Sequence, residues 1–298
     1  MNAPVNLKFK PEYRHIGVSP VTVNIGAEIE GVDLSQPLLP EVLAEIRQAW
    51  LQYKVIFFRD QIVTGEQHVR FARCFSDLEP HPVSPSVPGH PELMLLARGE
   101  TRKNSENEFH TDMTFRAVPP MGAVLRAVKL PPVGGDTIWV NMAAAYRGLS
   151  DEIREKIDGL VAVHDAVPVF AHRLDAGQLA KLRQDYPPIE HPVVVTHPET
   201  GEKVLFVNRI FTTHFTNTYT SKFIRRSEGD ALLTLLFNQV TLPEYQVRFR
   251  WKPNSIAAWD NRATQHYAVL DYIDESAPQT RRVMHRATLK GIARPVAA

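Results

Sequence analysis

The sequence predicts a mixed α/β protein that is mainly β, a sandwich or jelly roll of short strands with helices on its outside. Beyond residue 90 the chain is a succession of short apolar or alternating runs, which is typical of strands. Helix-period patterns interrupt these runs at only a few places. No repeat and no Gly/Ser-rich linker divides the 298 residues, so we expect a single domain.

The N-terminal part combines strand and helix patterns. VTVNIGAEIEGVDL (21–34) alternates apolar and polar residues between glycines, which predicts early strands and turns. PEVLAEIRQAWLQYK (40–54) starts with proline and repeats apolar residues every three or four positions, which predicts a helix. VIFFRD (55–60) then has the composition of a buried strand. Thr64 and Gln67 have the spacing of a capping box, which predicts that a second helix begins here.

The remainder predicts strands with two further helices, near 143–160 and 227–239, the second opened by Ser227. Two proline-rich or polar stretches, roughly 165–190 and 211–226, are expected to be long loops over the site. The expected strands are ELMLLA (92–97), GAVLRAVKL (122–130), DTIWV (136–140), HPVVVTH (191–197), KVLFV (203–207), VRFRW (247–251), SIAAWD (255–260) and RRVMHRATL (281–289).

The composition argues against several classes of partner. Hydrophobic residues make up 44% and charged residues 22%, as in an ordinary soluble protein. The 34 basic and 33 acidic residues nearly cancel, so charge gives no reason to expect nucleic acid or a membrane surface. We find no apolar signal segment and no apolar run of the roughly 18 residues that a membrane helix needs. The single cysteine, Cys74, fits a reducing compartment, so we expect a cytoplasmic protein.

EFHTDMTF (108–115) places a histidine and an aspartate two residues apart. If the stretch is extended, His110 and Asp112 project from one face, with Thr111 opposed. These are two of the three ligands of the facial triad that holds non-haem Fe(II). A hydrogen-bonded His/Asp pair without a metal is the plainer interpretation, and the pattern by itself leaves both open.

A third ligand must come from elsewhere among the twelve histidines. His266 stands out because WDNRATQHYAVLDY places it a short loop after a predicted strand, where a rigid scaffold presents a ligand well. The spacing alone makes His266 a candidate and does not exclude the others.

RRVMHRATL (281–289) carries two arginines on one face of a predicted strand, Arg282 and Arg286. An exposed edge strand with solubilising arginines would explain them without any function. The apolar residues of the same strand instead suggest burial, and buried guanidinium groups need anionic partners. Two buried arginines near a metal would imply two separate anionic ligands.

Five motifs in this order resemble the Fe(II)- and 2-oxoglutarate-dependent taurine dioxygenase family, which includes alkylsulfatase and phenoxyalkanoate dioxygenases. The motifs are GAEIEGVDL, HTDMTF, the GGDT turn, WDNRATQHYA and RRVMHRATL. The resemblance runs over about residues 19 to 292 and leaves residues 1–18 as an N-terminal extension of one catalytic domain. It implies a double-stranded β-helix, a cupin-like jelly roll that holds iron at its open end.

The resemblance also implies roles for individual residues. His110, Asp112 and His266 match the metal ligands, which makes them the catalytic centre. Thr137 and Arg282 match the residues that bind the distal carboxylate of 2-oxoglutarate. The remaining matches, which line the pocket for the primary substrate, are His81, Arg286, Phe211, Ser84, Glu106 and Ala166.

Three of these pocket positions differ from the members that act on taurine. Ser84 follows the HPV motif where those members have tyrosine, and Glu106 stands in place of an asparagine. Ala166, in VHDAV, stands where they have phenylalanine, whereas Phe211 keeps another pocket aromatic. His81 and Arg286 match the residues that hold the sulfonate. An anionic group is therefore a firmer expectation than taurine itself.

The expected function is hydroxylation of a small organosulfonate or organosulfate next to the heteroatom, with O2 and 2-oxoglutarate as co-substrates. The products would be sulfite or sulfate, an aldehyde, succinate and CO2. The expected role is the acquisition of sulfur. A phenoxyalkanoate carboxylate is an alternative substrate, since arginine also binds carboxylates. A non-catalytic jelly-roll binding or sensor protein and a zinc hydrolase are alternatives of other classes. The family resemblance further implies a homo-dimer or homo-tetramer.

Overall fold

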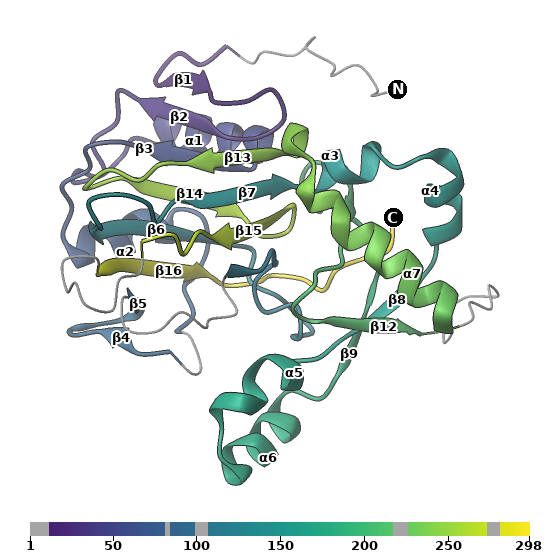
Figure 1. Ribbon diagram of the computed structural model, residues 1–298. Helices are drawn as coiled ribbons and strands as arrows, with labels where there is room; N and C mark the ends of the chain where they lie inside the picture. The colour runs from purple at the N-terminus through teal and green to yellow at the C-terminus, as the bar shows by residue number, and fades with distance from the viewer. Residues whose placement is uncertain (1–11, 81–83, 99–106, 217–225, 273–280) are drawn as a thin grey trace.

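The computed structural model describes residues 12–80, 84–98, 107–216, 226–272 and 281–298. Two sheets form the centre of the fold (Figure 1). The larger has, in spatial order, β1 (Gly17–Pro20), β2 (Ala27–Glu30), β3 (Val55–Phe58), β14 (Ile256–Asp260), β6 (Gly122–Lys129), β16 (Arg282–Leu289), β5 (His90–Arg98) and β4 (Ser86–Val87). The smaller has β13 (Gln246–Phe249), β7 (Thr137–Asn141) and β15 (Thr264–Ala268).

Aromatic side chains from both sheets fill the space between them. Phe57 of β3 stacks on Phe249 of β13 with ring centroids 4.0 Å apart. Trp139 of β7 meets Trp259 of β14 at 5.8 Å, and all four rings are buried. Truncating one such ring typically costs about 3–5 kcal/mol, so this core holds the two sheets in a fixed relation. The sandwich is the predicted mainly β jelly roll.

Two helices cover the outer face of the large sheet, and both are where the sequence predicts them. α1 spans Pro40–Tyr53 and α2 spans Gly65–Arg73. The predicted capping box is present, because the backbone N–H groups of Gln67 and Thr64 each donate to the other residue's side chain. Trp50 of α1 and Phe71 of α2 are buried in one apolar cluster with β3 and β14.

The predicted helix over 143–160 is wrong as a single element. The structure has α3 (Met142–Arg147) and α4 (Asp151–Ile157), separated at Gly148. Ser150 begins the second helix, since its side chain accepts a hydrogen bond from the N–H of Ile153. Ser150 offers the backbone an N-cap, which favours a new helix start over a continuous one.

The stretch 165–190 is not a long loop. It contains α5 (Val167–Phe170), a 3-10 turn (Ala171–Arg173) and α6 (Ala176–Asp185), which form the lobe at the bottom of Figure 1. Asp175 and Gln178 make a capping box that begins α6. This lobe continues from a third sheet, in the order β12 (Thr212–Thr216), β8 (Val161–His164) and β9 (Ile189–Pro192). The stretch 211–226 thus starts as a strand, and its residues 217–225 lie outside the described part.

The remaining elements form a second apolar core beside the sandwich. It joins α3 and α7 (Arg226–Phe237) to β10 (Val194–Thr196) and β11 (Lys203–Leu205). Helix α7 corresponds to the helix predicted near 227–239. Two 3-10 turns, Asn238–Thr241 and Pro243–Tyr245, connect α7 to β13. The expected strand over 191–197 is split between the end of β9 and the whole of β10, which belong to different sheets.

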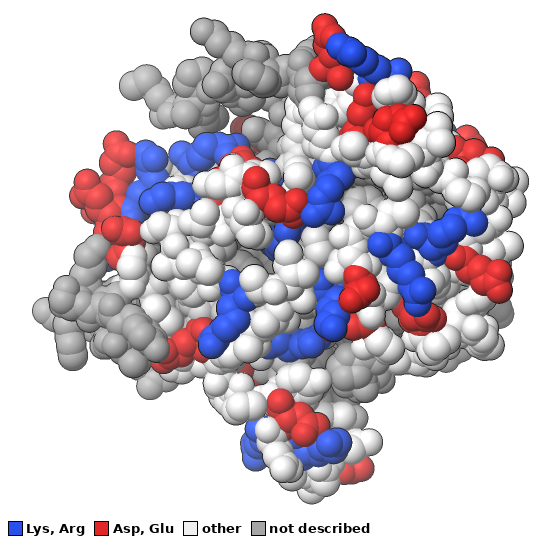
Figure 2. Space-filling view, turned by 180° about the vertical axis from the view of Figure 1, so that it is seen from behind, with Lys and Arg blue, Asp and Glu red and all other residues white. Residues whose placement is uncertain are grey.

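The surface shows no concentration of one charge on the face in Figure 2, where described residues of both signs lie interspersed. This agrees with the formal net charge of +1. Among the helices of the described ranges, none combines the length and the apolar character that crossing a membrane requires.

Candidate metal and oxoacid site

Two of the three predicted metal ligands are joined through their backbones. The N–H of His110 donates to the carbonyl of His266 at 3.1 Å, and the N–H of His266 donates back to that of His110 at 2.8 Å. The imidazole centroids lie 4.2 Å apart. His266 belongs to β15, and the loop of residues 261–263 separates that strand from β14.

Asp112 completes the group. Its Oδ1 lies 3.6 Å from Nε2 of His110 and 3.8 Å from Nε2 of His266. One ligand atom from each residue lies within 4.8 Å of the other two, and all three side chains are buried. Two imidazole nitrogens and one carboxylate oxygen are the donor set of the facial triad, so these residues fit an Fe(II) ion.

The segment that carries Asp112 is not the predicted strand. Only His110 makes a bridge, and a turn follows in which Met113 has a φ of 50°. The i, i+2 argument for His110 and Asp112 is therefore wrong, although its conclusion about proximity is correct. Thr111 is buried and donates its hydroxyl to the carbonyl of Thr264, which fastens the segment to β15.

The protonation states suit metal binding. Nδ1 of His110 lies 2.8 Å from the carbonyl oxygen of Glu108, which can only accept, so in the neutral ring Nδ1 carries the hydrogen and Nε2 has the lone pair. Burial lowers the pKa of His266 to about 3, so this imidazole is neutral near pH 7. Burial alone would raise the pKa of Asp112, but the charge of Arg286, with smaller contributions from the two histidines, holds it well below its usual range.

Arg282 and Arg286 both lie on β16, which sits between β6 and β5 and is not an edge strand. Their side chains are buried on the same face as Met284, as the alternation predicts. Arg286 donates through Nη2 to Oδ2 of Asp112 at 2.7 Å and through Nη1 to Oδ1 at 3.3 Å. A carboxylate has about four lone-pair sites, so Asp112 can accept from Arg286 and still offer Oδ1 to a cation.

Arg282 lies beside Thr137, at the start of β7. The hydroxyl oxygen of Thr137 accepts hydrogen bonds from Nη2 of Arg282 at 3.3 Å and from Nε1 of Trp251 at 2.9 Å. Trp251 also lies 5.7 Å from the guanidinium of Arg282, within cation–π range. With both lone pairs of the hydroxyl used, its hydrogen is left to donate. A guanidinium and a hydroxyl donor side by side suit a carboxylate.

The predicted pocket residues are only partly brought together. Phe211 and Ala166 are buried in one apolar cluster with Met113 and Phe115, the residues that follow Asp112. The ring centroids of Phe115 and Phe211 are 5.1 Å apart. An apolar cluster, formed largely by the α5–α6 lobe, therefore lies beside Asp112.

The other pocket residues lie near β4 or outside the described part. Ser84 is half-buried just before β4, where Ser86 pairs with Met94, the same residue that pairs with Arg286 from the other side. His81 and Glu106 lie outside the described residues, so the structure says nothing about them.

Sequence reasoning missed two residues of the site. It placed Trp251 only within a strand, although the N–H of this residue holds Thr137. Asn261, inside the WDNRATQH motif, hydrogen-bonds the backbone of Asp112. A polar residue immediately after a buried strand was a usable signal for Asn261, whereas no local signal pointed from Trp251 to Thr137.

Comparisons with known proteins agree with this geometry. A family model described as "Taurine catabolism dioxygenase TauD, TfdA family" matches residues 17–288. An alpha-ketoglutarate-dependent sulfate ester dioxygenase of Pseudomonas putida is 37% identical over 293 residues, 94% of this chain and 91% of that protein. An alkylsulfatase of Acinetobacter baylyi is 35% identical over 91% of this chain and 84% of its own length.

Solved structures are similar over nearly the whole chain. A taurine dioxygenase from Burkholderia xenovorans is 39% identical, with a TM-score of 0.79 over 95% of this chain and 92% of that one. AAD-2, solved with Mn(II) and N-oxalylglycine, is 27% identical, with a TM-score of 0.76 over 94% of this chain and 99% of its own.

Proposed function

Because the chain belongs to the taurine catabolism dioxygenase TauD, TfdA family, we propose that it oxidises a small organosulfate or organosulfonate with His110, Asp112 and His266 as its metal ligands. Its class is that of the 2-oxoglutarate-dependent non-haem iron dioxygenases, which require Fe(II), 2-oxoglutarate (alpha-ketoglutarate) and O2. The chemistry that this set supplies is oxidation of a carbon–hydrogen bond, coupled to the formation of succinate and CO2.

The observation that carries this proposal is that the two arginines of β16 have different partners. Arg282 pairs with Thr137 on one side of the site, and Arg286 pairs with Asp112 on the other. We assign Arg282 and Thr137 to the distal carboxylate of 2-oxoglutarate, where a guanidinium and a hydroxyl both donate. Trp251 holds the Thr137 hydroxyl in place for that contact.

Arg286 is then the cation for the primary substrate. Asp112 carries one negative charge and the two arginines carry two positive charges, so the described groups have one positive charge in excess. A divalent metal and dianionic 2-oxoglutarate cancel each other. The excess charge therefore favours a substrate with one negative charge, because a buried charge without a partner is costly. His81, expected beside Arg286, remains part of this proposal.

The apolar cluster beside Asp112 favours a substrate with a hydrocarbon tail. Met113, Phe115, Ala166 and Phe211 offer no charge to an ammonium group such as that of taurine. The two relatives described above are named for sulfate esters and alkyl sulfates, which join a sulfate anion to such a tail. Hydroxylation at the carbon next to the sulfate oxygen gives an adduct that collapses to an aldehyde and sulfate; a sulfonate would give sulfite. Ser84 and Glu106 stay assigned to the pocket as predictions.

A substrate panel tests the proposal. The protein is incubated with Fe(II), 2-oxoglutarate, ascorbate and O2, together with alkyl sulfates, alkanesulfonates including taurine, or phenoxyalkanoates. We expect succinate formation coupled to sulfate or sulfite release. Phenol release coupled to succinate formation would identify the phenoxyalkanoate alternative. A rate of succinate formation that no primary substrate raises above the substrate-free rate would support a non-catalytic binding protein. His110→Ala serves as the control without a complete ligand set.

Three broader predictions concern the extent of the domain, the compartment and the oligomeric state. We propose that residues 19–292 are one catalytic domain, which the extent of the family match supports. The single cysteine supports a reducing compartment such as the cytoplasm. The expected homo-dimer or homo-tetramer can be distinguished from a monomer by light scattering on the purified protein.

A further inference from the structure

The side chain of Asn261 makes three hydrogen bonds, two of them to one metal-ligand candidate. Its Oδ1 accepts from the N–H of Asp112 at 2.8 Å, and its Nδ2 donates to the carbonyl of the same residue at 3.1 Å. Nδ2 also donates to the carbonyl of Pro120 at 2.9 Å. A single buried carboxamide therefore binds both backbone polar groups of Asp112 and ties them to a second segment.

The Asp112 segment needs such a partner because it lies outside the sheets. The reciprocal bridge ends at His110, and the left-handed φ of Met113 turns the chain immediately after Asp112. A non-glycine residue in this region costs of order 1 kcal/mol and persists only where its surroundings hold it. Asn261 supplies the hydrogen bonds that a strand neighbour would otherwise provide.

Asn261 is itself held by the residues on either side of it. Asp260 is fully buried, accepts from Nε2 of His197 at 2.9 Å, and accepts from Nε and Nη2 of Arg262 at 2.8 and 2.7 Å. Arg262 also donates to Glu199 at 2.7 Å. This ion cluster fixes the turn between β14 and β15, and hence the position from which Asn261 reaches Asp112.

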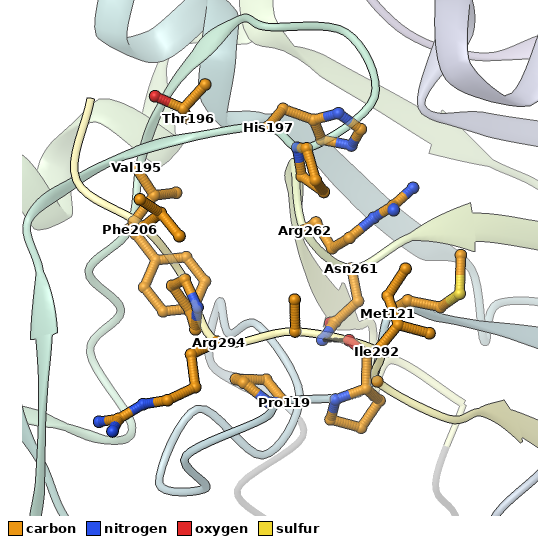
Figure 3. A pocket seen from close by; sticks show the side chains of 16 residues that line it. Pro119, Met121, Val195, Thr196, His197, Phe206, Asn261, Arg262, Ile292 and Arg294 are labelled. Atoms are coloured by element: carbon orange, nitrogen blue, oxygen red, sulfur yellow. Dashed lines mark hydrogen bonds between the residues drawn. The ribbon is translucent and has the colours of Figure 1, made fainter.

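A cavity of about 320 Å³ borders the same turn. In Figure 3, Asn261 and Arg262 lie on one wall, with Met121 and Ile292 near Asn261 and with His197 further along. Most of the lining is apolar, so on this side Asn261 borders apolar groups. Asn261 is nevertheless buried, and its carboxamide is held by its three hydrogen bonds.

We propose that Asn261 is a positioning residue for the metal carboxylate, fixing the backbone of Asp112 so that Oδ1 stays with the two imidazoles. The proposal rests on the metal assignment above. Its consequence is that losing Asn261 weakens metal binding beyond what lost fold stability explains. Partners that orient a metal ligand typically change metal affinity about 10- to 100-fold.

The test compares Asn261→Ala with a matched control, Asn141→Ala. Asn141 is also buried and also makes three hydrogen bonds, to Asn24 and to the first turn of α3. Co(II) affinity is measured by titration calorimetry and by the visible absorption of the bound ion, and thermal unfolding is measured without metal. We expect both variants to unfold at lower temperature, and only Asn261→Ala to weaken Co(II) binding by roughly tenfold or more.

Equal Co(II) affinity in wild type and Asn261→Ala, or an equal loss in Asn141→Ala, would overturn the positioning role. Should Asn261→Ala fail to fold, Asn261→Asp takes its place. The aspartate keeps an acceptor for the Asp112 N–H, but it puts an oxygen in place of Nδ2, the donor to the carbonyls of Asp112 and Pro120. The same loss of Co(II) affinity is expected. His110→Ala separates the two proposals. If it binds Co(II) as well as wild type, the metal assignment itself fails; if it alone loses binding, only the role of Asn261 fails.

Discussion

Arg286 and the two imidazoles divide the carboxylate of Asp112 between them. Oδ2 accepts from Nη2 of Arg286 at 2.7 Å. Oδ1 accepts a longer hydrogen bond from Nη1 of Arg286 at 3.3 Å and also faces Nε2 of His110 at 3.6 Å and Nε2 of His266 at 3.8 Å. The guanidinium thus orients the carboxylate mainly through Oδ2, and Oδ1 keeps lone-pair capacity on the side of the two imidazoles. Because Arg286 lies next to that carboxylate, a substrate anion held by Arg286 would lie next to the proposed metal position.

We expect Arg286→Ala to raise the KM of the primary substrate by about 10- to 100-fold, the range for a lost charge-assisted hydrogen bond. The KM of the co-substrate, 2-oxoglutarate, should change much less. Steady-state kinetics with each substrate varied in turn measure both values. Arg286→Lys keeps the charge but loses the bidentate contact, so its KM for the primary substrate should lie between those of wild type and Arg286→Ala. A larger effect on 2-oxoglutarate than on the primary substrate would mean that the two arginines are assigned the wrong way round.

Arg282→Ala should show the opposite pattern. The guanidinium and the Thr137 hydroxyl lie side by side, so removing the guanidinium should raise the KM of the co-substrate by about 10- to 100-fold. Calorimetric titration with 2-oxoglutarate checks this independently of turnover. Thr137→Val, which removes one hydroxyl and keeps the shape, should cause a smaller rise. Unchanged affinity for 2-oxoglutarate in Arg282→Ala would contradict the assignment.

Gly135→Ala should disturb the same end of the site through the backbone. Gly135 has a φ of 73°, and a Cβ there would lie 3.2 Å from Cδ of Arg282. The strained backbone costs about 1–2 kcal/mol, which corresponds to a fall in Tm of a few degrees. We therefore expect lower thermal stability together with weaker binding of 2-oxoglutarate, seen as a raised KM. Gly201→Ala has a similar φ of 69° and open space around it, so it should lower only the stability.

Stability should fall as the pH drops from about 6.5 toward 4. Burial lowers the pKa of His68 to about 3 and that of His191 to about 4, whereas an unfolded histidine titrates near 6.5. Between these values the unfolded chain binds more protons than the folded one, so acid favours unfolding. The depressed pKa of Asp260 acts in the same direction but only below about 4.

Thermal unfolding at a series of pH values between about 7 and 4.5 measures this slope. His68→Gln cannot gain a proton and retains a donor for the carbonyl of Val124, which His68 contacts at 3.1 Å. Its Tm should vary less with pH than that of wild type over this interval. An unchanged slope would show that His68 does not contribute to the acid sensitivity.

Patterns set by local chemistry were predictable from sequence. The capping box at Thr64 and the alternation along β16 depend on neighbours a few residues apart, and both are confirmed. The α5–α6 lobe was missed because α6 buries little, with Leu182 its one buried residue, so its apolar periodicity is weak. The capping pair Asp175 and Gln178 was the signal that could have found it.

The grouping of His110, Asp112 and His266 was predictable, and its geometry was less so. The Asp112 turn depends on hydrogen bonds from Asn261 and Thr111 to segments about 150 residues away, and no local pattern records such partners. The pairing of Arg286 with Asp112 depends on the placement of β16 in the middle of the large sheet. Both are decided by tertiary structure.

The reciprocal bridge between His110 and His266 also bears on how such a protein diversifies. The bridge is made by main-chain atoms, so the hydrogen bonds that join these two proposed ligands do not involve the side chains around them. The α5–α6 lobe and its apolar residues can therefore change by mutation while the ligand spacing is inherited intact. Relatives between 29% and 37% identical to this chain are named for compounds as unlike as sulfate esters and phenoxy acids. A proposed metal site joined through the backbone would give that divergence a physical basis.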